Sequence, residues 1–253
     1  MPNFWRIVNA VIDKSDVLLE ILDARLPYLT RNKEVEEKVG MTGKKLILVL
    51  NKADLIDQKT AEKYKKELSK EYPVVFVSST EHHGTKMLRE KILIACKKES
   101  IVVGVLGYPN TGKSSVINVL KGRKSASTSS QSGHTRGLQK IRITNRILML
   151  DSPGVLPFTE KDETKHVLIG TTTNVKDPDV YACEIIKIYP YVIAKHYDVE
   201  SYSDEYDLLE KIAEKRNMKI KGGEVDVDRA ARMVIRDWQT GKIKLNSSFF
   251  HKD

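Results

Sequence analysis

The chain has 253 residues, of which 40% are hydrophobic and 30% are charged, a balance that excludes wholesale disorder. Its two cysteines, Cys96 and Cys183, lack the spacing of a disulfide framework or a zinc site, and no apolar run is long enough to cross a membrane. The formal net charge of +9 favours an anionic partner, although a lysine-rich surface alone would give the same value. We therefore expect a cytoplasmic protein without membrane contact.

The first third of the chain alternates helical and strand patterns. Apolar residues at helical spacing predict a short amphipathic helix over residues 3–13. The run DVLLEILDAR predicts a buried strand over residues 16–25, and KLILVLN predicts another over residues 45–51. Between them, NKEVEEKVG is typical of a helix that ends at Gly40.

The alternation continues to residue 107. Helical patterns over residues 61–72 and 86–98 enclose the strand pattern PVVFVSST, and the strand pattern IVVGVLG follows them. Aliphatic strands separated by amphipathic helices predict an α/β fold with a doubly wound, mostly parallel sheet. In such sheets ligands bind at the carboxyl ends of the strands.

The composition changes after residue 120. Residues 121–146 contain seven Lys or Arg and no Asp or Glu, which predicts a mobile basic loop. The strand pattern RILMLD follows, and beyond residue 158 helical periodicity prevails. These changes predict a first domain of residues 1–165 and a small helical C-terminal domain of residues 166–253.

The segment GYPNTGKSS, which begins at Gly107, is a candidate phosphate-binding loop because it satisfies G-x-x-x-x-G-K-[ST] between a strand and a helix. Its glycines let backbone amides face phosphate oxygens, and Lys113 can neutralise their charge. The Ser114 hydroxyl can bind Mg²⁺. A second Mg²⁺ ligand is expected at a neighbouring strand end, where Asp151 begins DSPG, and Gly154 can offer its amide to a γ-phosphate.

The segment NKAD is a candidate guanine-binding loop at another strand end. Asp54 can accept the ring N–H and amino donors of guanine, while Asn51 braces the loop and the Lys52 stem covers the base. Taken alone, NKAD is more often a polar turn. The functional interpretation gains support from Ser78 and Ser79, which end a further strand where a backbone amide can meet the guanine carbonyl.

These motifs occur in the order NKAD, SST, GYPNTGKSS, GHTRG and DSPG, which is a circular permutation of the usual GTPase order. With LDARLPYLTRN near the start and KGGEVDVDRAARMVIRDWQTGK near the end, the chain resembles the YlqF/RbgA family of circularly permuted ribosome-assembly GTPases. The resemblance implies a permuted Ras-like P-loop fold and a C-terminal RNA-binding domain. It also implies partners, namely GTP or GDP, rRNA, and the large ribosomal subunit or its precursor.

The resemblance assigns site residues as well. The candidate nucleotide-binding residues come from four loops: Asn51, Lys52, Asp54, Ser78, Ser79, Asn110, Thr111, Gly112, Lys113, Ser114, Ser115 and Gly154. Lys113, Thr135 and Gly154 are the candidate catalytic residues. Ser114, Asp151 and Thr135 are the candidate Mg²⁺ ligands. Thr135 is the candidate switch threonine, which closes on Mg²⁺, and Thr128 is the alternative to it. Asn110 is a candidate K⁺ ligand. A loop-bracing role for Asn110 would look the same in the sequence.

The residue after DSPG is Val155, where Ras-like enzymes carry a water-orienting Gln. A valine cannot hydrogen-bond water, and the resemblance to GTPases with a hydrophobic residue here implies slow intrinsic GTP hydrolysis that a partner stimulates. Near the C-terminus, Arg229, Arg232 and Arg236 fall on one helical face and are candidate RNA-binding residues. A solvated face paired with nearby acids explains the same arginines equally well.

The favoured function is therefore a GTPase that assists large-subunit assembly and binds pre-ribosomes in a nucleotide-dependent way. Two alternatives stay open: a small-molecule P-loop phosphotransferase, and a non-ribosomal GTP-dependent RNA-binding switch.

Overall fold

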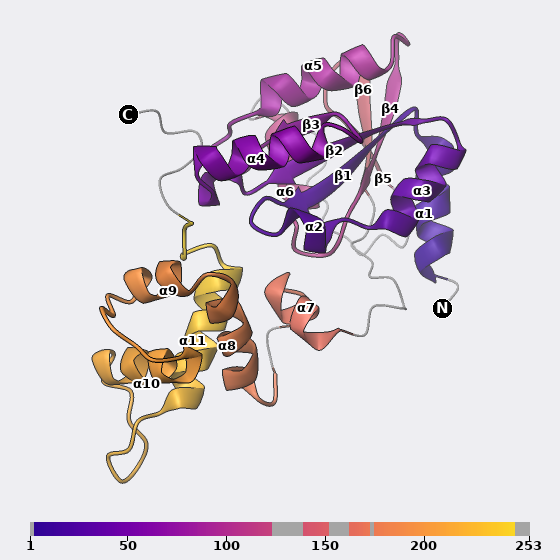
Figure 1. The fold of residues 1–253 in the computed structure, drawn as a ribbon. Coiled ribbons are helices and arrows are strands. Elements are labelled where there is room, and N and C mark those ends of the chain that lie inside the picture. The colour runs from indigo at the N-terminus through magenta and orange to yellow at the C-terminus, as the bar shows by residue number, and fades with distance from the viewer. Residues whose placement is uncertain (1–2, 123–138, 152–161, 173–174, 246–253) are drawn as a thin grey trace. The chain divides into compact units, whose positions relative to one another are not determined.

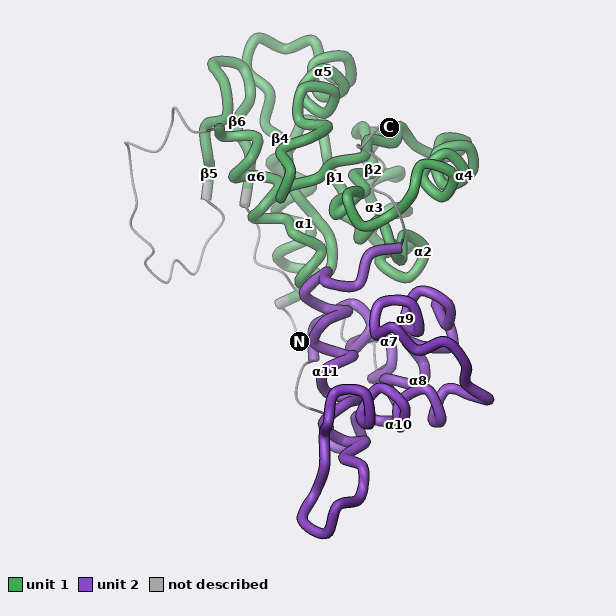
Figure 2. Tube along the Cα trace, turned by 90° about the vertical axis from the view of Figure 1, so that its left-hand side faces the viewer, with its two compact units in different colours: residues 1–160, 247–253 green, residues 161–246 purple. Residues whose placement is uncertain are grey.

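The computed structural model describes residues 3–122, 139–151, 162–172 and 175–245 (Figure 1). The chain divides into two compact units, one of residues 1–160 and 247–253, and the other of residues 161–246 (Figure 2). Within the described ranges, every named strand belongs to the first unit and the second unit is built from helices.

The first unit is built on one six-stranded sheet with the order β3-β2-β1-β4-β6-β5. All neighbouring strands run parallel except β5 and β6, which are antiparallel. The predicted α/β fold with a mostly parallel sheet is thus confirmed. The strands are β1 (Val17–Asp23), β2 (Lys45–Asn51), β3 (Val74–Phe76), β4 (Ile101–Leu106), β5 (Gln139–Arg142) and β6 (Ile147–Asp151).

The sheet has a topological switch point between its two central strands. From β1 the chain adds β2 and then β3 in one direction, whereas from β4 it adds β6 and β5 in the other. Strands β1 and β4 pair in register, with Leu19 opposite Val105, so their carboxyl ends meet at the middle of one sheet edge. Such a position is where open α/β sheets bind ligands.

Helices cover both faces of this sheet. Alternate strand residues such as Leu19 and Val49 join one core cluster with Leu88 of α5 and Val116 of α6. On the sheet's other face, α1 packs against β4 and α3 against β2. The helical segments are α1 (Asn3–Lys14), α2 (Pro27–Thr30), α3 (Lys33–Met41), the 3-10 turn η1 (Ala53–Leu55), α4 (Gln58–Leu68), α5 (Thr85–Ala95) and α6 (Lys113–Lys121).

Two local predictions were wrong. Helix α3 does not end at Gly40 but continues to Met41, because the left-handed residue that follows the helix is Gly43, with φ 68°. The segment predicted as a mobile loop, residues 121–146, contains strand β5, which pairs along one side with β6. Exposed Lys140 and Arg142 alternate with half-buried Ile141, as in a strand, but the basic composition of the segment is also typical of a loop.

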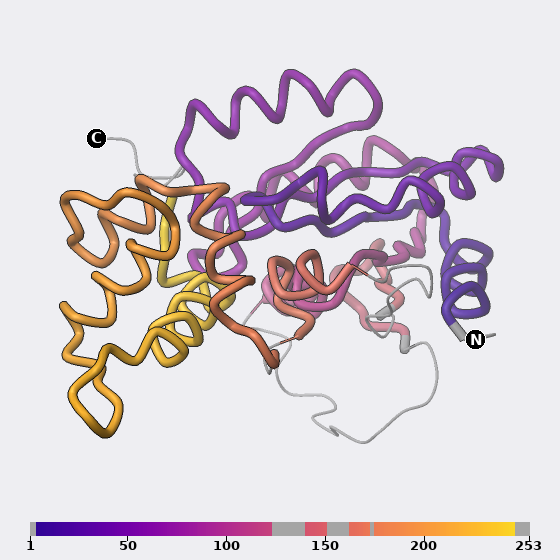
Figure 3. The backbone as a smooth tube through the Cα atoms, turned by 60° about the horizontal axis from the view of Figure 1, so that its bottom comes forward, coloured from indigo at the N-terminus to yellow at the C-terminus, as the bar shows by residue number. Residues whose placement is uncertain are grey.

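The second unit packs its helices around α11, which contacts α7, α8 and α10. Helices α10 and α11 can be followed in orange and yellow in Figure 3. The predicted apolar face of α11 is confirmed, because Ala231, Val234, Ile235 and Trp238 are all buried. The helices are α7 (Glu163–Leu168), α8 (Pro178–Ile188), α9 (Pro190–His196), α10 (Glu205–Lys215) and α11 (Val227–Gln239).

Candidate functional site

Asn51, the last residue of β2, joins three loops at the carboxyl edge of the sheet. The residue is 2% exposed. Its Nδ2 donates to the Thr111 carbonyl at 2.9 Å, and its Oδ1 accepts a hydrogen bond from Ser79 Oγ at 2.8 Å. The NKAD, SST and phosphate-loop segments, which are distant in the sequence, therefore form one connected site.

Asp54 is oriented by the SST segment. Its Oδ1 accepts a hydrogen bond of 2.6 Å from the buried Ser78 hydroxyl, which also accepts one from the Glu81 amide at 3.1 Å. In the described part of the chain no protein group donates to Asp54 Oδ2. A carboxylate held this way at a strand end can receive paired N–H donors from a ligand.

The phosphate loop depends on glycine at two positions. Gly107 has φ 138°, and a Cβ there would lie 2.5 Å from the Ile21 carbonyl of β1. Gly112 has φ 92°, and a Cβ there would lie 2.2 Å from Asn51 Nδ2. No other residue type allows this backbone to pass so close to its neighbours.

Lys113 lies within the turn of the same loop. Its Nζ donates to the carbonyls of Gly107 at 2.9 Å and Tyr108 at 2.6 Å, and the residue is 7% exposed. Thr111 Oγ1 also donates to the Tyr108 carbonyl. Asn110 is exposed and left-handed, with φ 61°, a conformation that Asn tolerates better than most residues.

Two of the predicted Mg²⁺ ligands, Ser114 and Asp151, belong to elements that the structure describes. Ser114 and Ser115 are exposed in the first turn of α6, beside its N-terminal amides. Asp151 is the last residue of β6, the strand that pairs with β4. Ser114 thus belongs to the helix that follows β4, and Asp151 ends the neighbouring strand β6. A hydroxyl with a carboxylate is a ligand pair that suits Mg²⁺. Three predicted site residues lie outside the described ranges: Thr135, its alternative Thr128, and Gly154.

A buried ion network lies at the end of β1, beside the NKAD loop. Asp23 accepts hydrogen bonds from Arg25 Nη2 at 2.8 Å and from Lys52 Nζ at 2.7 Å. Burial alone would raise the pKa of Asp23, but the charges of Arg25 and Lys52 outweigh it and hold that pKa well below its usual range. Lys52 itself has a left-handed backbone, with φ 62°. The sequence marks Asp23 and Arg25 through the segment LDARLPYLTRN but does not reveal the contact of Asp23 with Lys52.

The three arginines of α11 are exposed, opposite its buried face. Asp226 caps the helix by accepting from the Arg229 amide at 3.0 Å. Arg232 forms an ion pair with Asp228 at 2.8 Å, and Arg236 lies 3.8 Å from Asp237. The helix thus presents a basic face in which two of the three guanidinium groups have acidic neighbours.

Comparisons with known proteins agree with this geometry. A family model of 50S ribosome-binding GTPases matches residues 102–220, and one of RsgA GTPases matches residues 36–159. An uncharacterized GTP-binding protein of Methanocaldococcus jannaschii is 42% identical over 94% of this chain and 65% of its own length. Nucleolar GTP-binding protein 2 of Neurospora crassa is 35% identical over 94% of this chain and 40% of its own.

Two solved structures share the whole fold. They are YlqF from Thermotoga maritima in its GNP-bound form, with TM-score 0.69, 26% identity and coverage of 97% of each chain, and in its GDP-bound form, with TM-score 0.71 and the same identity. The predicted resemblance is confirmed. The chain spans about two fifths to two thirds of the length of the first curated relatives it matches. None of its described helices combines the length and apolar character needed to cross a bilayer.

Proposed function

We propose that this chain, which has the fold of the YlqF-type circularly permuted P-loop GTPases, hydrolyses GTP to GDP and phosphate in the cytoplasm as a large-subunit assembly factor. The observation that carries the proposal is the position of Asn51. One buried amide hydrogen-bonds both the SST segment and the phosphate loop, so a base-binding loop and a phosphate-binding loop are held at one sheet edge.

Guanine selection falls to Asp54. Ser78 fixes the carboxylate from one side, which leaves its Oδ2 for the ring N–H and amino group of guanine. Adenine presents an acceptor where guanine has its ring N–H, and so cannot satisfy this carboxylate in the same way. Ser79 and the stem of Lys52 complete the base pocket in this proposal.

The phosphates bind the loop from Asn110 to Ser115. Amides at the start of α6 donate to them, and the Lys113 ammonium moves from its carbonyl partners to the β and γ oxygens. Ser114 and Asp151 would hold Mg²⁺, which when bound neutralises charge on those oxygens. Asn110 is the proposed ligand of a K⁺ ion.

Hydrolysis also needs residues of the GHTRG and DSPG segments. In the proposal Thr135 closes on the metal ion, and the Gly154 amide contacts the γ-phosphate. Val155 supplies no hydrogen bond to the attacking water, so the intrinsic rate is slow and a partner completes the site.

The proposed partner is the large ribosomal subunit or its precursor, contacted through rRNA. The matched family is described as ribosome-binding, and the net charge of +9 favours a polyanion. The exposed arginines Arg229, Arg232 and Arg236 of α11 are the proposed RNA-binding residues.

The test combines base specificity with partner dependence. Wild type is assayed for GTP hydrolysis with and without large ribosomal subunits, in K⁺ and in Na⁺ buffer. Asp54→Asn is expected to lose GTP hydrolysis and to gain hydrolysis of xanthosine triphosphate. Xanthine has a carbonyl where guanine has its amino group, so the asparagine amide can donate to it. Asp57→Asn is the matched control, because the Asp57 side chain caps α4 by accepting from the Thr60 amide, and Asn caps equally well.

Stimulation by subunits together with the base switch would support the proposal. A preference for ATP, or phosphorylation of a small acceptor, would instead indicate a phosphotransferase. GTP-dependent RNA binding without any response to subunits would indicate a non-ribosomal switch.

A further inference from the structure

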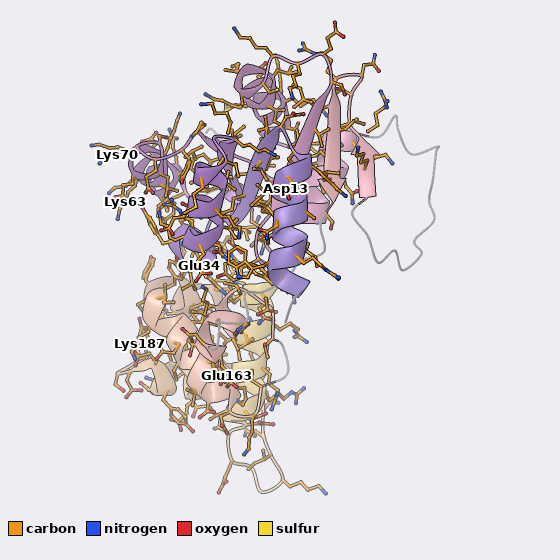
Figure 4. The ribbon with its side chains drawn as sticks, turned by 90° about the vertical axis from the view of Figure 1, so that its right-hand side faces the viewer. Asp13, Glu34, Lys63, Lys70, Glu163 and Lys187 are labelled. Carbon is orange, nitrogen blue, oxygen red and sulfur yellow. The ribbon has the colours of Figure 1, made fainter. Side chains whose placement is uncertain are left out.

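Helix α4, between the base loop and β3, carries a row of lysines that the nucleotide site does not use. We define the α4 lysine row as Lys59, Lys63, Lys66 and Lys70, the last of which lies in the turn just beyond the helix. All four are exposed. Figure 4 shows Lys63 and Lys70 extending outward from the same side of this segment.

The row follows one side of the helix. At 3.6 residues per turn, Lys59, Lys63 and Lys66 fall within about 60° of arc and span about 10 Å along the axis. The buried residues Ala61 and Leu68 lie on the opposite side, so the lysines face away from the sheet. The helix therefore presents a narrow line of positive charge to solvent.

The acids of the same segment are already bonded to other partners. Glu62 accepts from Gln58 Nε2 at 2.9 Å, and Glu67 accepts from the Tyr28 hydroxyl. Glu71 is held by Arg31 at 2.9 Å and by Lys33 at 2.8 Å.

Among the described residues, no ion pair neutralises the row. In the described ranges none of its four lysines lies within ion-pair distance of an acid. Glu67 and Glu71 thus bind residues outside α4, Glu62 binds Gln58 within it, and in the described ranges none of the three forms an ion pair with the row.

We infer that the α4 lysine row binds an RNA phosphate backbone. Regularly placed cations along a rigid helix complement a regularly charged strand. A protein interface is less suited, because lysine is depleted at such interfaces and the row has no apolar or aromatic anchor among its lysines. A membrane surface is less suited too, because the apolar side of α4 is buried against the sheet.

This inference adds a second RNA contact, in the first unit, to the one proposed on α11. It depends on the proposed function only for naming rRNA as the natural source of the backbone. The row lies outside the nucleotide loops, so its removal is expected to leave basal GTP hydrolysis unchanged.

The experiment compares two fourfold variants of the full chain. One carries Lys→Gln at residues 59, 63, 66 and 70. The control carries Lys→Gln at four exposed lysines that also lack ion pairs in the described ranges but lie on no common face: Lys14, Lys86, Lys91 and Lys97. Binding of a fluorescein-labelled RNA hairpin is titrated across a salt series, with polyglutamate as a second probe.

The row variant is expected to bind the hairpin on the order of tenfold more weakly, and its salt slope is expected to shrink by about three. The control variant should keep most of the hairpin affinity and most of the salt slope. Equal losses in the two variants would overturn the inference, as would no loss in the row variant or no hairpin binding by wild type. Row-dependent binding of polyglutamate but not of RNA would assign the row to an acidic protein instead.

Failure of the inference and failure of the proposed function are distinguishable. If subunits do not stimulate GTP hydrolysis but hairpin binding still depends on the row, the proposed function fails and the inference stands. If subunits stimulate GTP hydrolysis of both variants equally and hairpin binding does not depend on the row, the inference fails and the proposed function stands.

Discussion

Asp23 and Lys52 meet at 2.7 Å across adjacent strand ends, with the carboxylate 3% and the lysine side chain 22% exposed. The contact links the Asp-Ala-Arg segment, Asp23 to Arg25, to the NKAD loop and holds a lysine whose backbone is left-handed. A paired, buried carboxylate in this position fixes where the Lys52 stem can lie. The segment therefore has a structural role at the site's edge.

Replacement of that carboxylate should weaken both fold and site. Asp23→Asn removes the anionic partner of Arg25, which is 1% exposed, and should lower the free energy of unfolding by about 3 kcal/mol. Affinity for fluorescent GDP should fall about tenfold because Lys52 is no longer held. Urea denaturation and fluorescence titration measure the two effects. Lys98→Gln, which breaks a surface pair with Asp16, is the control and should change little.

Acid should affect wild type and that variant differently. Because the folded-state pKa of Asp23 lies below its ordinary value of 3.8, its contribution is fully present above pH 3.8 and is lost as the pH falls through the lowered pKa. Asp23→Asn should lack this part of the acid dependence. Equal slopes in acid for the two proteins would contradict the ion network.

The titration of Glu20 should change stability with pH in the direction opposite to that of Asp23. Burial, and next the charge of Glu36, raise its pKa well above the ordinary value of 4.5. Wild-type stability should therefore fall as the pH rises from 4.5 towards the raised pKa. Glu20→Gln keeps an acceptor for the Asn32 amide and removes the titration, so its stability relative to wild type should increase over that range. Exposed Glu34→Gln should show no such trend.

The phosphate loop offers a matched pair of glycines. Gly112 and Gly122 both have positive φ, but a Cβ collides with Asn51 only at Gly112 and meets nothing within 4 Å at Gly122. Gly112→Ala should therefore weaken fluorescent GDP binding about a hundredfold or more, whereas Gly122→Ala should cost about 1 kcal/mol of stability and leave affinity nearly intact. Similar affinities for the two variants would show that the approach of Gly112 to Asn51 is unimportant.

Trp238 should dominate the stability of the second unit. Its Nε1 donates to the Leu168 carbonyl at 2.9 Å in a buried position, and its ring stacks on Tyr189. Trp238→Phe leaves that carbonyl without this donor and should cost about 2 kcal/mol. Calorimetry should show a lower melting temperature for the transition of residues 161–246. Tyr191→Phe, at a 68% exposed residue, is the control.

The sequence predicted the sheet well because its strands are buried on both faces and read as aliphatic runs, as in β1 and β2. It predicted the phosphate loop because the loop needs glycine at fixed positions, where the backbone has positive φ and passes close to its neighbours. It missed β5, since an edge strand with Lys140 and Arg142 in alternate positions resembles a basic loop. It also missed the contact of Asp23 with Lys52, because a pairing over 29 residues depends on strand register, which one sequence does not reveal.

The permuted strand order also has a consequence for synthesis on the ribosome. Strand β1 pairs with β4 through Val17 and Val103, so the sheet cannot close until most of the first unit has been translated. The half that contains β1 to β3 leaves the exit tunnel first, while the edge of β1 that will pair with β4 is still unpaired. Any ligand that needs both halves can bind only after that closure, so it stabilises the finished unit and has no role in forming the first three strands.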